Sequence, residues 1–149
     1  MNEPSKTATP KPIGYWFKHI DKTLEDNFVA LLAADGLRRR HWQIMHTLSG
    51  GPLDATALDV ALSPFLNPQD PTATPYVAAL AERGWVLIDA TGTHSLSADG
   101  VTAHANLFER IQIQRRAVTE GLTDDDYRTL LDLLQRVSAN VDRFAMTLR

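Results

Sequence analysis

The only dense group of positive charge in this chain is a run of three arginines, Arg38, Arg39 and Arg40. Lys and Arg side chains that neutralise phosphates supply most of the affinity of proteins for nucleic acids. Three cations near a helix start oppose the helix dipole by about 0.3–1 kcal/mol each, which contact with phosphate would offset. The alternatives are a solvated helix edge, or ion pairs with Asp35 and nearby acids. The run is therefore a candidate phosphate-binding site.

The five histidines and the acidic residues form no pattern typical of a metal site or an active site. His41 and His46 are five residues apart, which places them on different helix faces, and there is no His-x-x-x-His motif. The sequence has no Gly-x-Ser-x-Gly elbow and no phosphate-binding glycine loop. Asp124-Asp125-Asp126 stands where a helix is expected to begin, and the helix dipole favours acids there. We expect no metal, no cofactor and no enzymatic activity.

Composition indicates an ordinary globular protein. The chain has 149 residues, 44% of them hydrophobic and 22% charged, which fits one domain or one compact module with a helical appendage. Its apolar runs fall far short of the roughly 18 residues of a membrane span, and no signal peptide opens the chain, so we expect a cytoplasmic protein. Without cysteine, the chain can form neither a disulfide nor a thiolate zinc site.

The net charge of −3 is unevenly distributed along the chain. Residues 1–53 hold seven Lys and Arg against five Asp and Glu, residues 54–100 hold one against six, and residues 101–149 hold seven against seven. The middle third therefore has a net charge of −5, which opposes the binding of phosphates there.

Apolar residues at three- and four-residue spacing predict three helices in the first part of the chain, after a flexible tail over residues 1–12. The first helix covers residues 13–36. The second covers residues 39–49, has Trp42 on its apolar side, and is stopped by Gly50-Gly51-Pro52. The third covers residues 54–62 and is capped by Asp54.

A stiff connection with four prolines follows, and Pro71-Thr72 is the expected start of a fourth helix that ends at Gly84. Residues 86–89 and 94–96 alternate as two strands around a turn at 91–93, with Val86 and Ile88 on one face. A fifth helix is expected after Gly100, over residues 101–120. A sixth should begin at a capping box formed by Thr123 and Asp126.

The apolar stripe of the sixth helix continues to residue 148 and is longer than a small core can cover. Together with the long first helix, it predicts a homodimer. We therefore expect a mostly α fold with a small β-hairpin wing: a winged helix-turn-helix over residues 37–100, and a helical dimerisation region over residues 13–36 and 101–149.

The sequence resembles the MarR/SlyA family of bacterial regulators over nearly all of residues 13–145. The resemblance rests on a His-Trp pair in the second helix, a Leu-Glu-x-Arg-Gly-Leu-Val-like segment, a Leu-Thr-x-x-Gly-like segment after the wing, and a late Gly-Leu-Thr followed by acids. These motifs are His41-Trp42, Leu80-Ala81-Glu82-Arg83-Gly84-Trp85-Val86, Leu96-Ser97-Ala98-Asp99-Gly100 and Gly121-Leu122-Thr123-Asp124-Asp125-Asp126.

The resemblance implies a homodimer that binds palindromic double-stranded DNA, with the fourth helix in the major groove and the wing in the minor groove. It implies DNA contacts at the start of the fourth helix, in the wing and at neighbouring basic residues: Thr72, Thr74, Tyr76, Arg83, Thr93 and His94, together with Arg38, Arg39 and Arg40. Relatives commonly have an arginine or another polar residue where this chain has Pro75, and a longer wing with an Asp-x-Arg motif.

Family members often bind aromatic effectors between the dimerising helices and the winged domain. Trp16, His19 and His41 are the candidates to line such a cleft here; the alternative is a filled structural seam. We interpret the chain as a dimeric DNA-binding repressor modulated by a small aromatic ligand. The alternative is a winged-helix homodimer that has lost tight DNA binding and uses its acidic face for a protein partner.

Overall fold

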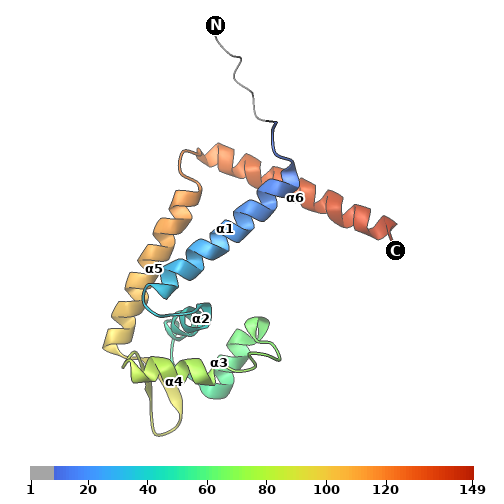
Figure 1. Ribbon diagram of the computed structural model, residues 1–149. Coiled ribbons are helices and arrows are strands. Elements are labelled where there is room, and N and C mark those ends of the chain that lie inside the picture. The colour runs from blue at the N-terminus through green and yellow to red at the C-terminus, as the bar shows by residue number, and fades with distance from the viewer. Residues whose placement is uncertain (1–8) are drawn as a thin grey trace. The chain divides into compact units, whose positions relative to one another are not determined.

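The computed structural model describes residues 9–149 and contains six α-helices and a small antiparallel sheet within that range (Figure 1). It divides into two compact units: the first ends at Ile111, and the second is Gln112–Arg149. Of the predicted tail over residues 1–12, residues 1–8 lie outside the described part, and residues 9–12 have no regular secondary structure. The predicted class, mostly α with a β wing, is confirmed.

The core of the first unit is formed where five helices meet: α1 (Ile13–Ala33), α2 (Arg39–Leu48), α3 (Ala55–Leu62), α4 (Thr74–Glu82) and the first half of α5 (Ala98–Val118). Their inward-facing side chains are almost inaccessible to solvent and include Leu32, Ile44, Met45, Leu58, Leu80 and Leu107. Trp42 also belongs to this core, as its place on the apolar side of α2 predicts.

One cap expected from sequence, Asp54, is confirmed, and the expected start of the fourth helix is corrected. Asp54 accepts a hydrogen bond from the Ala57 N–H (2.7 Å) at the start of α3. The fourth helix begins at Thr74 and not at Pro71-Thr72, with Pro75 in its first turn. The start is displaced because Thr72 and Ala73 are bonded to α3, which holds them outside the helix.

The wing is part of a three-stranded sheet in the order β1-β3-β2, formed by β1 (Leu53–Asp54), β2 (Val86–Ile88) and β3 (Thr93–Leu96). The predicted hairpin of β2 and β3 is present, with Val86 opposite Leu96. Sequence periodicity missed β1, whose two residues are too few to show alternation. The expected shared face of Val86 and Ile88 is not buried as a whole, because Val86 is 2% exposed and Ile88 is 51% exposed.

Gly100 lies in the first turn of α5 and against the backbone that enters β2. A Cβ atom added to Gly100 would come within 2.0 Å of the Trp85 carbonyl oxygen. The Ser97 side chain accepts a hydrogen bond from the Gly100 N–H (3.0 Å) and donates to the Gly84 carbonyl, so both ends of the hairpin are joined at this point. The fifth helix was expected to begin after Gly100, which is three residues too late, because this cap places Ala98 in the helix.

The second unit contains the end of α5 and α6 (Asp124–Thr147). α6 begins at the predicted capping box: Thr123 accepts from the Asp126 N–H, and Asp126 accepts from the Thr123 N–H, both at 3.0 Å. No residue of α6 is buried within the chain. Its exposed apolar residues include Tyr127, Leu130, Leu134, Val141 and Phe144. None of the described helices is long and apolar enough to cross a membrane.

Candidate nucleic-acid interface

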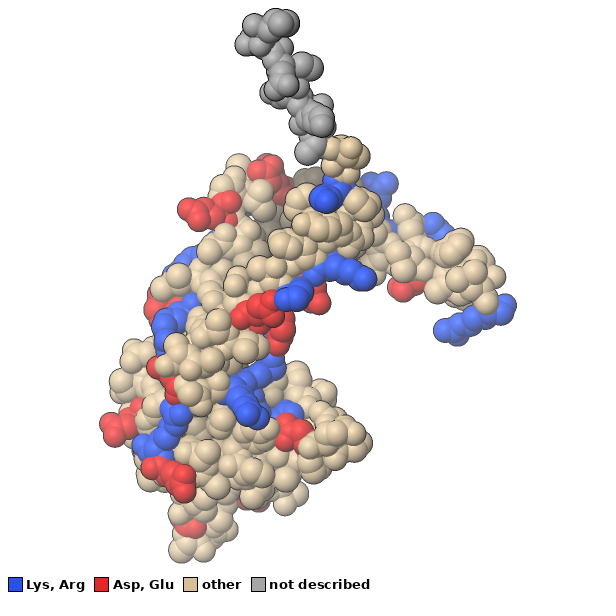
Figure 2. Space-filling view, in the orientation of Figure 1, with Lys and Arg blue, Asp and Glu red and all other residues tan. Residues whose placement is uncertain are grey.

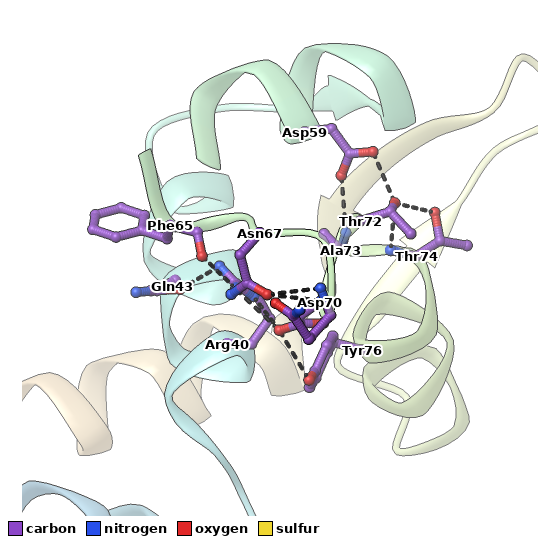
Figure 3. Close-up of polar contacts among 11 residues, drawn as sticks. Arg40, Gln43, Asp59, Phe65, Asn67, Asp70, Thr72, Ala73, Thr74 and Tyr76 are labelled. Carbon is purple, nitrogen blue, oxygen red and sulfur yellow. Dashed lines mark hydrogen bonds and ion pairs between the residues drawn. The ribbon is translucent and has the colours of Figure 1, made fainter. Parts of the chain in front are cut away.

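Arg40 is fully engaged inside the chain. Its side chain is 9% exposed and donates from Nε (3.3 Å) and one terminal nitrogen (3.0 Å) to the Asp70 carboxylate. The same terminal nitrogen reaches the Phe65 carbonyl at 2.7 Å, and the other donates to Gln43 at 3.0 Å (Figure 3). A guanidinium with these partners has little capacity left for phosphate. Sequence analysis left open whether the arginine run binds phosphate or forms ion pairs within the chain. Arg40 forms an ion pair.

The Arg40–Asp70 pair fixes the loop before α4. Asp70 is paired with Asn67 across a short bridge, and its carboxylate also accepts from the Tyr76 hydroxyl of α4 at 3.2 Å. The Asn67 side chain accepts from the backbone N–H of Gln69 and of Asp70, each at 3.0 Å. One carboxylate thus links α2, the loop and α4 (Figure 3).

Asp59 of α3 fixes the other side of the α4 start. Its two carboxylate oxygens accept from the Thr72 hydroxyl (2.8 Å) and from the Ala73 N–H (2.9 Å). Thr72 in turn accepts from the Thr74 N–H at 3.2 Å. Sequence analysis did not identify Asp59, because its partners are 13 and 14 residues away and nothing local distinguishes it from a solvated acid.

Arg38 and Arg39 are the exposed members of the arginine run. Arg39 pairs with Glu25 of α1, and its guanidinium lies 4.4 Å from the centre of the Phe28 ring. The Arg38 N–H donates to Nδ1 of His41 at 2.9 Å, which requires an unprotonated Nδ1. Burial, and then the charges of Arg83 and Arg38, lower the pKa of His41 and favour this neutral form.

Arg83, which follows α4, binds the backbone at the end of α1 and does not extend freely into solvent. It donates to the carbonyl oxygens of Asp35 (2.8 Å) and Gly36 (3.3 Å), and its guanidinium lies 5.0 Å from the Trp85 ring centre. The Asp35 side chain pairs with Arg110 of α5. The acids that meet the arginine run are therefore Glu25 and Asp70, whereas Asp35 serves a different contact.

The wing tip is organised by a carboxylate. Asp89 Oδ1 accepts from the Thr91 hydroxyl (2.7 Å) and from the N–H groups of Thr91 and Thr93 (2.9 Å each). The Thr91 hydroxyl contributes most to lowering the pKa of Asp89. His94 is 7% exposed and pairs with Ile88 at the turn end of the hairpin, and its Nδ1 has no hydrogen-bond partner within the described chain. A fixed negative charge at the tip disfavours approach to phosphates.

The three residues predicted for an effector cleft fall into two ring clusters. Trp16 lies edge-on to Tyr15 (5.2 Å between ring centres), and His19 stacks on the same tyrosine at 5.7 Å, all on α1. His41 lies edge-on to Tyr76 of α4 at 5.1 Å. Among the described residues, no ring contact joins His41 to Trp16 or His19.

Sequence analysis missed a cluster of four rings between α2 and α5. Trp42 stacks with His46 and with His104, at 5.1 Å in each case, and Phe108 lies 6.1 Å from both histidines. Nδ1 of His46 is 3.1 Å from Nε2 of His104. Burial, followed by the charge of His46, lowers the pKa of His104. The two histidines are 58 residues apart, so spacing along the chain could not reveal the pair.

Basic residues do not merge into one stripe on the face shown in Figure 2, where Lys and Arg form small groups interrupted by acids and uncharged surface. The sequence matches no protein-family profile. It also matches no curated protein sequence.

Comparison with solved structures gives many neighbours. A putative MarR family transcriptional regulator from Clostridium acetobutylicum has a TM-score of 0.70 at 18% identity, over 88% of this chain and 99% of its own. A MarR family protein of Mycobacterium tuberculosis, solved in complex with DNA, has a TM-score of 0.63 at 21% identity, over 86% and 98%. NadR in complex with 4-hydroxyphenylacetate has a TM-score of 0.58 at 22% identity, over 89% and 99%.

These likenesses define the class of fold. The helices α2 to α4 and the three-stranded sheet form a winged helix-turn-helix, followed by the long helices α5 and α6. More particularly, the fold is that of the MarR family regulators, as the sequence motifs predict.

Proposed function

We propose that the protein is a dimeric DNA-binding transcription regulator of the MarR type, with no enzymatic activity, that represses its targets and responds to a small aromatic ligand. The observation that carries this proposal is the double attachment of the α4 start, by Asp59 on one side and by the Arg40–Asp70–Tyr76 network on the other. A recognition helix must be held rigidly to read base edges, and both attachments serve that purpose.

The proposed DNA contacts are a reduced set of those expected from sequence. Arg38 and Arg39 are exposed and supply phosphate contacts, Thr72 and Thr74 face the groove, and Thr93 approaches from the wing. Tyr76 and Arg40 support the interface through Asp70, and Arg83 supports it through the end of α1. The buried His94 lies within the small sheet, between Leu53 and Ile88, and is left out of this set. With few cations, affinity should be modest and strongly dependent on salt.

The proposed homodimer rests on the apolar residues that α1 and α6 leave exposed in a single chain, such as Ile13, Ile20, Leu130 and Leu134. A twofold dimer would carry two recognition helices and fit a palindromic operator. The proposed effector would be a small aromatic molecule near Trp16, His19 and His41. The fold neighbour NadR, solved with 4-hydroxyphenylacetate, supports this class of ligand.

A second candidate function is a winged-helix homodimer that uses its acidic middle third for a protein partner. Two observations favour it: the net charge of −5 over residues 54–100, and the fixed Asp89 carboxylate at the wing tip. A basic protein surface would complement both features.

The deciding experiment measures binding of the purified protein to a fragment of its own upstream region, beside a scrambled fragment, across a salt series. A regulator should prefer the native fragment, and its affinity should fall linearly with salt on a log-log plot. Arg38→Ala with Arg39→Ala should flatten that slope, whereas Arg115→Ala on α5 should leave it unchanged. Equal binding to both fragments by a folded dimer would favour the protein-partner function.

A further inference from the structure

The outward face of α4 carries few groups that could donate a hydrogen bond to a base. Its exposed residues are Thr74, Pro75, Ala78 and Glu82, and three of them follow one another at four-residue spacing along one side of the helix. The side chains of Pro75 and Ala78 contain only carbon and hydrogen, and the Glu82 carboxylate can only accept. The helix therefore has two side-chain donors, the hydroxyl groups of Thr74 and Tyr76.

Both of these hydroxyl protons are used within the chain. Tyr76 donates its proton to the Asp70 carboxylate at 3.2 Å. Thr72 donates its own to Asp59 at 2.8 Å, so the proton in the 3.1 Å contact between the two threonine hydroxyls comes from Thr74 (Figure 3). Because a hydroxyl group has one proton, neither donor of α4 can also donate to a base while these bonds persist.

The cations next to α4 do not replace the missing donors. Arg83 directly follows the helix and donates to backbone carbonyl oxygens at the end of α1, at 2.8 and 3.3 Å. Arg40 donates to Asp70 and to the Phe65 carbonyl. The major-groove edge of guanine presents two acceptors, O6 and N7, which proteins commonly read with an arginine. The outward face of α4 offers no such partner to guanine.

We propose that α4 reads the C5-methyl groups of pyrimidines in the major groove, through the apolar atoms of Thr74, Pro75 and Ala78. This inference rests on the proposed function, because it requires that α4 enters the groove of DNA. The methyl group of thymine is the apolar feature of the major-groove edges, and alanine and threonine methyl groups are its usual partners. 5-Methylcytosine carries the same group at the same ring position, so thymine and methylated cytosine are the two sources of this chemistry.

The attachments at the start of α4 suit readout of this kind. Apolar contact has no preferred direction, so a methyl group is distinguished from its absence only if the helix is held at a fixed position in the groove. Asp59 holds the Ala73 N–H at 2.9 Å, directly before the helix. The hydroxyl bond of Thr74 restricts its side chain to one rotamer, which also fixes the position of its methyl group.

The test compares DNA duplexes that differ only in methyl groups, by fluorescence anisotropy of the full chain at one salt concentration. Alternating A·T duplexes of about 30 base pairs are long enough for two helices one helical turn apart. Prepared with thymine or with uracil, they carry a methyl group at every base pair or at none, so the reading register need not be known. Alternating G·C duplexes with cytosine or 5-methylcytosine form the second pair.

The thymine duplex should bind at least about tenfold more tightly than the uracil duplex. A buried methyl group changes a binding constant roughly fourfold, and a dimer would bury at least two. A similar preference for the methylated G·C duplex would show that the methyl group is read in either base. A response in one pair alone would identify its base as the source. Salt-dependent binding that is equal within both pairs would overturn methyl readout.

Two variants with the same added charge locate the readout. Ala78→Arg places a guanidinium group on the outward face of α4, where it can donate to guanine, and should reduce the ratio of thymine to uracil affinity at least about threefold. Ala117→Arg adds the same charge at an exposed position of α5 and should leave the ratio unchanged. Circular dichroism verifies that both variants keep their helices. An unchanged ratio in Ala78→Arg would show that α4 does not read the methyl groups.

The failure of this inference can be separated from the failure of the proposed function by means of the upstream fragment, prepared with thymine or with uracil throughout. Sequence-dependent binding that survives this replacement would retain the regulator and overturn methyl readout. A preference for the thymine duplex, without any preference for the upstream fragment over its scrambled control, would retain methyl readout and overturn the regulator. Absence of binding to every duplex by a folded dimer would overturn both.

Discussion

At the scale of single residues, neighbouring arginines in one run have different roles. Arg40 is buried against Asp70 and the Phe65 carbonyl, whereas Arg39 makes an ion pair whose two side chains are about half exposed. Their burial decides their energetic weight, because exposed ion pairs contribute little and the loss of a buried, hydrogen-bonded charge leaves its partners unsatisfied. Position in the sequence could not separate them, since their partners lie in distant segments.

We therefore predict that Arg40→Ala lowers the free energy of unfolding by about 1–3 kcal/mol, because Asp70 and the Phe65 carbonyl lose their donor. Arg39→Ala, the matched control, should lower it by less than about 1 kcal/mol. Urea denaturation of both variants measures the difference. Arg40→Lys should not restore full stability, because an ammonium group cannot reproduce the forked contacts. Equal losses in the two alanine variants would contradict the assigned role of Arg40.

At the scale of elements, α5 lies against the backbone of Trp85, directly before β2, because residue 100 is glycine. We predict that Gly100→Ala lowers the free energy of unfolding by about 1–3 kcal/mol, because the new methyl group would meet the Trp85 carbonyl and α5 would have to move. Gly14→Ala in α1 is the control: its Cβ meets nothing within 4 Å, so this change should not destabilise the chain. Thermal unfolding of the two variants should give opposite shifts. Similar shifts would show that the contact does not limit packing.

The four-ring cluster places two histidines in contact between α2 and α5, so we expect the stability of this contact to depend on pH. Nδ1 of His46 and Nε2 of His104 can share one proton at 3.1 Å, but two protonated rings would repel each other. Because the folded-state pKa of His104 is lowered, the unfolded chain binds its proton more readily, and stability should fall as pH drops below the ordinary histidine value of about 6.5.

We predict that the urea midpoint falls between pH 7 and pH 5, and that His104→Gln reduces this fall. His41, whose pKa is also lowered, contributes with the same sign and is retained in that variant, so part of the pH dependence should persist. Denaturation curves at several pH values measure both chains. An unchanged pH dependence in His104→Gln would exclude the histidine pair as its source.

Features of the helices and strands that depend on residues close together in the sequence were predictable, and features that depend on residues far apart in the sequence were not. The Asp54 cap and the Thr123–Asp126 capping box follow from residues three positions apart, so sequence alone identified them. The strand β1 and the role of Asp59 depend on partners far along the chain. The start of α4 was misplaced for the same reason, because Asp59 holds Thr72 and Ala73 outside the helix.

At the scale of the whole molecule, the order of the helices and the hairpin in the sequence predicted the fold. The sequence did not predict which cations are free to bind a partner and which are bonded within the chain. Of the cations expected to contact DNA, Arg40 and Arg83 are occupied within the chain. Under the proposed function, each chain would neutralise few phosphates, and binding to DNA would depend on presenting two copies together.

The proposed function therefore depends on the proposed dimer. α6 buries none of its residues within its own chain, and Leu130 and Leu134 lie one turn apart on its exposed apolar stripe. We predict that Leu130→Glu with Leu134→Glu converts the dimer into a monomer in analytical ultracentrifugation, because two charges would be placed in an apolar interface. Gln135→Glu adds a charge to the same helix and should leave the dimer intact. The monomer should also lose sequence-dependent DNA binding while its first unit keeps its helical circular dichroism. A double variant that remains dimeric would show that α6 lies outside the interface.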